Sequence, residues 1–308
     1  MNILLELFLL SLGFLLLVKG ADWFVDGASG IATKLRIPQL VIGLTIVAMG
    51  TSAPEAAVSL SAALKGSAEI TIGNIVGSNI LNILIILGLA SALIPIAVAK
   101  STLRVDIPFM MLITGLLLVL GWDGTIGFVD GLILLTLFAG YLVYLFIGAK
   151  NSPAEEPVKN LSLWKSLTLT VIGLGLIILG ADIAVDAATS LARIFGMSER
   201  FIGLTIVALG TSLPELFTSV SAARKGNADI AIGNIVGSNI FNILFIVGLS
   251  GLIVPVPFAS PFRIDTVIAI LAGIVLLVLA LPKGKLLRRH GPLMLLLYGI
   301  YLGWLLMV

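Results

Sequence analysis

The sequence predicts an all-α polytopic membrane protein with ten transmembrane helices, arranged as two inverted five-helix repeats. Three observations predict this fold class: an apolar composition, a long internal repeat, and an odd number of apolar spans in each half. Hydrophobic residues make up 59% of the 308 residues and charged residues only 11%, whereas soluble domains carry about 25% charged residues. We therefore expect most of the chain to lie in a lipid bilayer.

The two halves of the chain repeat one another at a constant offset of 160 residues. Residues 43–91 align without a gap to residues 203–251, and 34 of these 49 positions are identical. Similarity of this extent indicates an internal duplication. The polar stretch NSPAEEPVKN separates the copies and is typical of a linker. The expected organisation is a first five-helix repeat at 1–148, a cytoplasmic linker at 149–162 and a second five-helix repeat at 163–308.

Apolar stretches near twenty residues, the length that crosses roughly 30 Å of hydrocarbon, follow one another along each half. The first of them has no basic residue ahead of Lys19, so we expect a retained helix and not a cleaved signal. Because five crossings bring the chain out on the opposite side, the second half is expected to be inverted. The predicted spans are 3–27, 38–64, 70–95, 105–121, 126–148, 163–187, 200–224, 230–255, 263–281 and 291–307.

Basic residues divide unequally between the two faces of this predicted arrangement. Thirteen Lys and Arg residues fall on the face of the central linker, whereas the other face holds four: Lys65, Arg193, Arg200 and Arg263. Cytoplasmic loops of membrane proteins are enriched in these residues. We therefore expect a multi-pass protein of the cell (plasma) membrane, with the linker in the cytoplasm and both termini outside.

Composition also excludes several kinds of site and partner. The net charge of +2 is too small to predict a nucleic-acid partner. The absence of cysteine excludes disulfides and thiolate metal sites, and the single histidine, His290, cannot form a metal cluster. No cofactor is expected, and the sequence identifies no protein partner.

An acidic residue follows a proline in the middle of one span in each half. The segments are GTSAPE, which ends at Glu55, and GTSLPE, which ends at Glu215. A carboxylate at the bilayer centre costs roughly 2.5 kcal/mol or more, so it should face the protein interior. The preceding proline removes an N–H and breaks the helix, which should free the backbone carbonyls around residues 48–51. Such oxygens suit hard cations like Ca²⁺ and Na⁺.

The alternative interpretation is that these polar groups only hydrogen-bond neighbouring helices. The pairing of an acid with a helix-breaking proline in both halves favours a cation site. Four other acids lie near helix ends, where they are expected to reach an interface: Asp22, Asp26, Asp182 and Asp186. Of these, Asp22 and Asp182 could also line an access path.

A second repeated motif, GNIVGSNILNI and GNIVGSNIFNI, follows each acidic segment. Ser78 and Asn82 are four residues apart and share a helix face, as do Ser238 and Asn242. Close helix packing would explain the glycines but not these polar side chains, whose oxygens could complete a coordination shell. The remaining amides could be structural hydrogen bonders: Asn74, Asn79, Asn234 and Asn239.

The two pairs of motifs resemble the alpha-repeats of the sodium/calcium exchanger family, within the calcium/cation antiporter superfamily. The resemblance covers nearly the whole chain and implies ten helices in two inverted halves. It also implies a secondary active antiporter that exchanges Na⁺ for Ca²⁺ by alternating access at a mid-membrane site.

The resemblance further implies which residues hold the transported ions. It implies a calcium site made by the carboxylates of Glu55 and Glu215 and the carbonyls of Thr51 and Thr211. Sodium sites would flank it, with Asn82 and Asn242 completing the centre. The implied sodium sites lie near Ala48, Ser52, Ser78 and Glu215 on one side, and near Ala208, Ser212, Ser238 and Glu55 on the other. Potassium-dependent relatives carry an acid at one of the amide positions, so the two asparagines argue against potassium co-transport.

Three rival functions remain to be compared. A proton/calcium antiporter of the same superfamily could use the same glutamates as proton carriers, although the four repeated serines favour sodium. A cation channel usually builds its filter from a ring of subunits, whereas here two inverted halves would enclose one site. A membrane hydrolase could use paired carboxylates, but no further catalytic group accompanies them.

Overall fold

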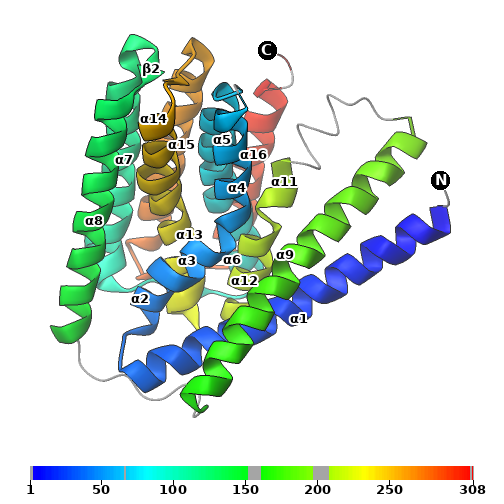
Figure 1. Ribbon diagram of the computed structural model, residues 1–308. Helices are drawn as coiled ribbons and strands as arrows, with labels where there is room; N and C mark the ends of the chain where they lie inside the picture. Colours follow the sequence, from blue (N-terminus) through cyan, green and yellow to red (C-terminus); the bar gives the residue numbers. More distant parts are fainter. Residues whose placement is uncertain (1–2, 66, 152–160, 197–207, 306, 308) are drawn as a thin grey trace.

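The computed structural model describes residues 3–65, 67–151, 161–196, 208–305 and 307. In this part of the chain the structure consists of helices, with four two-residue strands in two short ladders (Figure 1).

The first half contains helices joined end to end through π-helical turns. Its elements are α1 (Ile3–Leu35), α2 (Gln39–Ile42), η1 (Gly43–Val47), α3 (Ala48–Thr51), α4 (Ala53–Leu64), α5 (Glu69–Leu81), η2 (Asn82–Leu87), α6 (Gly88–Leu93), β1 (Ile96–Ala97), η3 (Thr102–Asp106), α7 (Ile107–Leu120), η4 (Gly121–Asp123), β2 (Thr125–Ile126) and α8 (Phe128–Asn151).

The second half repeats this order in its described residues. Its elements are α9 (Leu163–Ile194), α11 (Ala208–Thr211), α12 (Leu213–Arg224), α13 (Ala228–Phe241), η6 (Asn242–Val247), α14 (Gly248–Ile253), β3 (Val256–Pro257), α15 (Ser260–Ala280), β4 (Lys285–Leu286) and α16 (His290–Leu305).

The described residues confirm a helical membrane protein. Seven continuous helices are long and apolar enough to cross a bilayer, and the bent pair Gln39–Thr51 and Ala53–Leu64 makes an eighth if it is one span. The predicted span at 291–307 corresponds to the shorter apolar helix α16. The predicted span at 200–224 lies partly outside the described residues.

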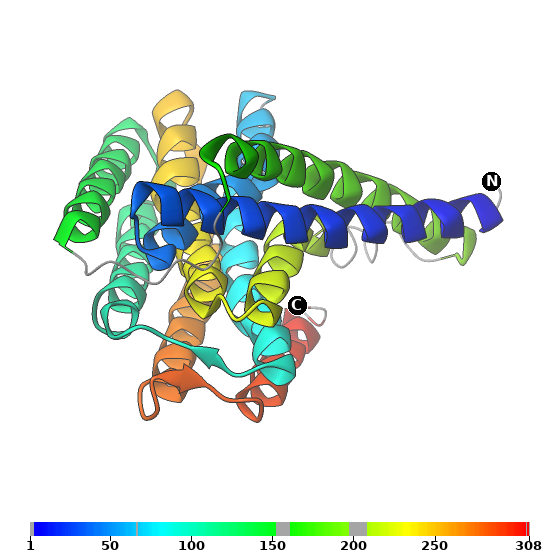
Figure 2. The ribbon, with the colours of Figure 1, turned by 90° about the horizontal axis from the view of Figure 1, so that it is seen from below.

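Helices α1 and α9 lie side by side across one side of the helix bundle, as both views show (Figures 1 and 2). Both are longer than predicted, extending to Leu35 and Ile194. The extension of α1 is rich in small residues that α9 covers: a Cβ added at Gly27 would meet Thr170, and one at Gly30 would meet Ser166. Packing against a partner helix thus continues α1 beyond its apolar stretch.

The strand ladders link the two halves in an exchanged pattern. Strand β1 pairs with β4, and β2 pairs with β3, both antiparallel. At the 160-residue offset, β1 corresponds to β3 and β2 to β4. Each ladder therefore joins one element of the first half to the non-equivalent element of the second.

The elements that carry the repeated motifs meet in the centre of the molecule. Helix α13 is buried continuously from Ile230 to Phe241 and packs against α2, η1 and α3. Helix α4 packs against α5 and η6, while α12 packs against α13 and η2. Residues of both halves are thereby interleaved around the two glutamates.

Candidate cation-binding site

A helix break at Ser52 places Glu55 in the protein interior. The axis bends by 48° between α3 and α4. Pro54 lies in the first turn of α4, where its missing N–H costs no helical hydrogen bond within α4. The break was expected to free the backbone carbonyls around residues 48–51. That expectation was wrong for Ala48, whose carbonyl still accepts from the Ser52 N–H at 3.0 Å.

The glutamate of each half lies against the serine of the other half. Both Glu55 and Glu215 are fully buried, at 0% exposure. The Ser52 hydroxyl donates to Glu215 Oε1 at 2.9 Å, and the Ser212 hydroxyl donates to Glu55 Oε1 at 3.3 Å. Because Ser52 and Glu55 lie one helical turn apart, these bonds bring the two carboxylates into one site.

Four buried oxygen acceptors, on the two glutamates and on the asparagines that begin η2 and η6, have no hydrogen-bond partner among the described residues. They are Glu55 Oε2, Glu215 Oε2, Asn82 Oδ1 and Asn242 Oδ1. A buried acceptor without a donor costs about 1–3 kcal/mol, and a native interior leaves few of them. Two carboxylate and two amide oxygens are a ligand set that a hard cation would satisfy.

The amides of Asn82 and Asn242 are held by two further asparagines. The Asn82 Nδ2 donates to Asn239 Oδ1, and the Asn242 Nδ2 donates to Asn79 Oδ1, both at 3.0 Å. Asn79 Nδ2 donates to the Asn239 carbonyl and Asn239 Nδ2 to the Asn79 carbonyl, both at 3.1 Å. All four side chains are buried, and the network is reciprocal between the halves.

A third pair of asparagines supports the broken helices. Asn74 Nδ2 donates to the Ser59 hydroxyl at 3.0 Å, and Asn234 Nδ2 donates to the Ser219 hydroxyl at 2.9 Å. The Thr51 hydroxyl donates to Asn234 Oδ1 at 3.0 Å. The two amide–serine bonds tie α4 to α5 and α12 to α13, one turn beyond each glutamate, and the threonine bond ties α3 to α13.

The other residues predicted for the site are only partly described. The Ser238 hydroxyl donates to the Ala48 carbonyl at 3.4 Å. Ser78 is buried on α5, which packs against α11. Thr211 is half-buried, and the side chain of Ala208 lies outside the described residues.

Asn79, Asn234 and Asn239 form hydrogen bonds around the candidate site, the role that the sequence had left open for them. Spacing places Asn79 on the same helix face as Asn82, since the two are three residues apart. It does not indicate that Asn79 contacts Asn242 of the other half.

A cavity of about 540 Å³ reaches the helix break between α4, α9 and α11. Ala53, Pro54 and Thr211 line it near the site, and Asp182 and Asp186 line it on α9. Asp182, for which a position on an access path was considered from the sequence, thus lines a cavity that extends to the helix break.

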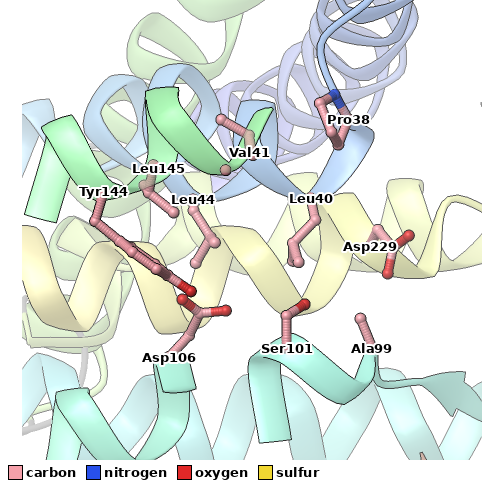
Figure 3. Close-up of a pocket in the computed structure, with 11 residues that line it drawn as sticks. Pro38, Leu40, Val41, Leu44, Ala99, Ser101, Asp106, Tyr144, Leu145 and Asp229 are labelled. Atoms are coloured by element: carbon pink, nitrogen blue, oxygen red, sulfur yellow. The ribbon is translucent and has the colours of Figure 1, made fainter. Parts of the chain in front are cut away.

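A second cavity, of about 250 Å³, lies elsewhere, with Asp106 and Tyr144 at one end and Asp229 at the other (Figure 3). The Tyr141 hydroxyl donates to Asp106 at 3.2 Å, and the second half repeats this pairing as Tyr301 and Asp265 at 3.0 Å. A tyrosine thus holds an acid in each half. Neither Glu55 nor Glu215 lines this cavity, so it is separate from the candidate site.

Comparison with known proteins places this arrangement in a family. A family model described as sodium/calcium exchanger protein matches residues 5–147 and 165–307. The putative antiporter CaxA of Alkalimonas amylolytica is 41% identical over 286 residues, covering 90% of each chain. The sodium/calcium exchanger MaX1 of Methanosarcina acetivorans is 32% identical, covering 96% of each chain.

A solved structure agrees with these matches. The sodium-calcium exchanger NCX_Mj, soaked with zero Na⁺ and Ca²⁺, superposes with a TM-score of 0.87 and 35% identity, covering 99% of this chain and 100% of that chain. Since the family model matches both halves and the relatives match nearly the full length, this chain belongs to the sodium/calcium exchanger protein family of membrane antiporters.

Proposed function

We propose that this protein is a secondary active antiporter that exchanges Na⁺ for Ca²⁺ at the site between Glu55 and Glu215. The observation that carries the proposal is the set of four buried acceptor oxygens, two from each half, that have no donor in the described part of the chain. The names of the relatives MaX1 and NCX_Mj support the choice of ions.

The charge of the site explains why the protein would exchange ions and not let them pass in one direction without a counter-ion. Two ionised glutamates give the empty site a formal charge of −2 within the membrane. Moving an uncompensated buried charge through an occluded state is heavily penalised. One Ca²⁺ or two Na⁺ ions neutralise the site, and a third Na⁺ leaves +1. The loaded protein can therefore change conformation readily, whereas the empty protein cannot.

We propose ten spans in two inverted halves, with the linker in the cytoplasm and both termini outside. The exchanged strand ladders and the reciprocal serine–glutamate bonds support a two-fold relation between the halves. The unequal distribution of Lys and Arg supports the orientation. On this orientation the cavity at Asp182 and Asp186 would admit ions from outside.

A single comparison of driving gradients tests the coupling ion. Outward gradients of Na⁺, K⁺ or H⁺ should be imposed, one at a time, on vesicles that contain the purified protein. The readout is ⁴⁵Ca²⁺ uptake. We expect outward Na⁺ to drive uptake and outward K⁺ to be inactive, because both amide positions are Asn and carry no added charge. Uptake driven by a proton gradient without Na⁺ would establish the rival proton/calcium exchange.

A further inference from the structure

In the network of Asn79, Asn82, Asn239 and Asn242, the available donors and acceptors fix which way each side-chain amide is turned. A backbone carbonyl can only accept a hydrogen bond, so the amide group that faces the Asn239 carbonyl must be the NH₂ of Asn79. The Asn79 Oδ1 then faces Asn242, which must present its own NH₂ to it. This orientation leaves the Asn242 Oδ1 directed away from the network, where it has no donor among the described residues.

The same logic runs in reverse through the other half. The Asn79 carbonyl fixes the Asn239 amide, and Asn239 Oδ1 fixes the NH₂ of Asn82. The Asn82 Oδ1 is thereby left as a buried acceptor. Because two backbone carbonyls fix the chain of bonds, each of the two amides keeps its NH₂ in the network and leaves its oxygen buried without a donor among the described residues.

We propose that Asn79 and Asn239 are positioning residues that make Asn242 and Asn82 cation ligands, by preventing their amide groups from turning NH₂ toward the site. This inference rests on the proposed function for its ions but not for its geometry. Without Asn79, the Asn242 amide loses its acceptor and can rotate, and its NH₂ would then repel a cation.

The test is a double-mutant cycle on Ca²⁺ affinity, measured by calorimetry on purified protein in detergent. Asn79→Leu should weaken Ca²⁺ binding roughly ten-fold, the cost of losing a fixed buried acceptor. In an Asn242→Ala background, where the dependent ligand is already absent, Asn79→Leu should have no further effect. The matched control is Ser91→Ala on α6, which removes the buried hydrogen bond from the Ser91 hydroxyl to the Gly88 carbonyl. This variant should leave the affinity for Ca²⁺ unchanged.

Additive losses in the cycle would overturn the proposal, because a merely structural role would not depend on Asn242. If Asn79→Leu does not fold, the reciprocal cycle of Asn239→Leu with Asn82→Ala tests the same claim. Failure of Na⁺-driven uptake in the unmodified protein that still binds Ca²⁺ would contradict the antiport proposal alone.

An independent observation concerns two equivalent clusters of charges, each formed between the two halves, of which one is closed and the other open. Lys225, at the end of α12, lies 2.8 Å from Asp26 and 3.6 Å from Asp22 of α1. The Ser221 hydroxyl donates to Asp22 at 2.6 Å. These contacts hold the end of α12 against α1, on the face that the distribution of Lys and Arg assigns to the linker.

An equivalent cluster at the 160-residue offset carries the same residue types, and it too takes residues from both halves. They are Ser61 and Lys65 on α4, and Asp182 and Asp186 on α9. Among the described residues no hydrogen bond or ion pair joins these two groups, and both aspartates line the cavity of about 540 Å³. Partly exposed ion pairs are weak, so such a latch can open and close.

We infer that the two clusters are alternating latches: when the site opens toward the linker face, Lys225 releases Asp22 and Asp26, and Lys65 closes on Asp182 and Asp186. This inference rests on the proposed antiport. Each latch would seal one access route, and the shared carboxylate, lysine and serine chemistry would make the two sealed states comparable in energy.

Disulfide trapping tests the latches cleanly, because the chain contains no cysteine. The pair Ser221→Cys with Asp22→Cys should cross-link in the described conformation. The pair Ser61→Cys with Asp182→Cys should cross-link only when α9 closes on α4, and its cross-linking should stop Ca²⁺ uptake reversibly with reductant. Uptake that persists in fully cross-linked Ser61→Cys/Asp182→Cys protein, or both pairs closing fully in one four-cysteine molecule, would overturn the inference. Loss of uptake in the unmodified protein would instead count against antiport.

Discussion

Glu55→Gln or Glu215→Gln should reduce sodium-driven calcium uptake into proteoliposomes by at least 100-fold. Each substitution replaces a buried carboxylate, at 0% exposure, with a neutral amide of the same shape. Removing the carboxylate from a buried pair of carboxylate and bound cation costs about 3–5 kcal/mol. This cost corresponds to a loss in affinity for Ca²⁺ of roughly 100-fold or more. The Ser212 or Ser52 hydroxyl can still donate to the amide oxygen, so the protein should fold.

The control for this prediction is Glu69→Gln. Glu69 is an exposed acid at the start of α5, and its loss should leave uptake unchanged. Uptake at the unmodified level in either buried-glutamate variant, with the protein incorporated normally, would end the antiport proposal.

Gly173→Ala should destabilise the folded protein, whereas Gly175→Ala on the same helix should not. A Cβ at Gly173 would lie 2.5 Å from the Phe24 nitrogen and 2.8 Å from the Gly20 carbonyl oxygen. Both are backbone atoms of α1 and cannot move without separating the helices. Overpacking of this kind costs about 1–3 kcal/mol or more.

The two alanine variants should move the unfolding temperature in opposite directions. Gly175 is exposed, and no described atom outside its own helix region lies within 4 Å of an added Cβ. Alanine there should stabilise the helix by about 0.5–1 kcal/mol. Both effects are measured by heating the protein in detergent and determining the fraction that remains monodisperse at each temperature. Equal unfolding temperatures for the two variants would show that the tight contact of α1 with α9 is dispensable.

Much of the site could be predicted because the same motifs occur in both halves of the chain. The mid-span positions of Glu55 and Glu215, and their neighbouring prolines, follow from local pattern alone. The spacing of Ser78 and Asn82 likewise placed two polar groups on one helix face. The role of Asn79 could not be predicted, because its amide acts on Asn242 of the other half, and no spacing within one repeat encodes a contact between repeats.

The sequence by itself determined the membrane class, the duplication and the paired acids, since hydropathy and repeated motifs are local properties of the chain. Only the tertiary structure decided that Asn79 meets Asn242, that α1 continues to Leu35, and that Lys225 is paired whereas Lys65 has no ion pair among the described residues. Each of these depends on how the two halves lie against each other. Equivalent sequences in the two copies can therefore adopt different contacts, because their surroundings differ even where their residues do not.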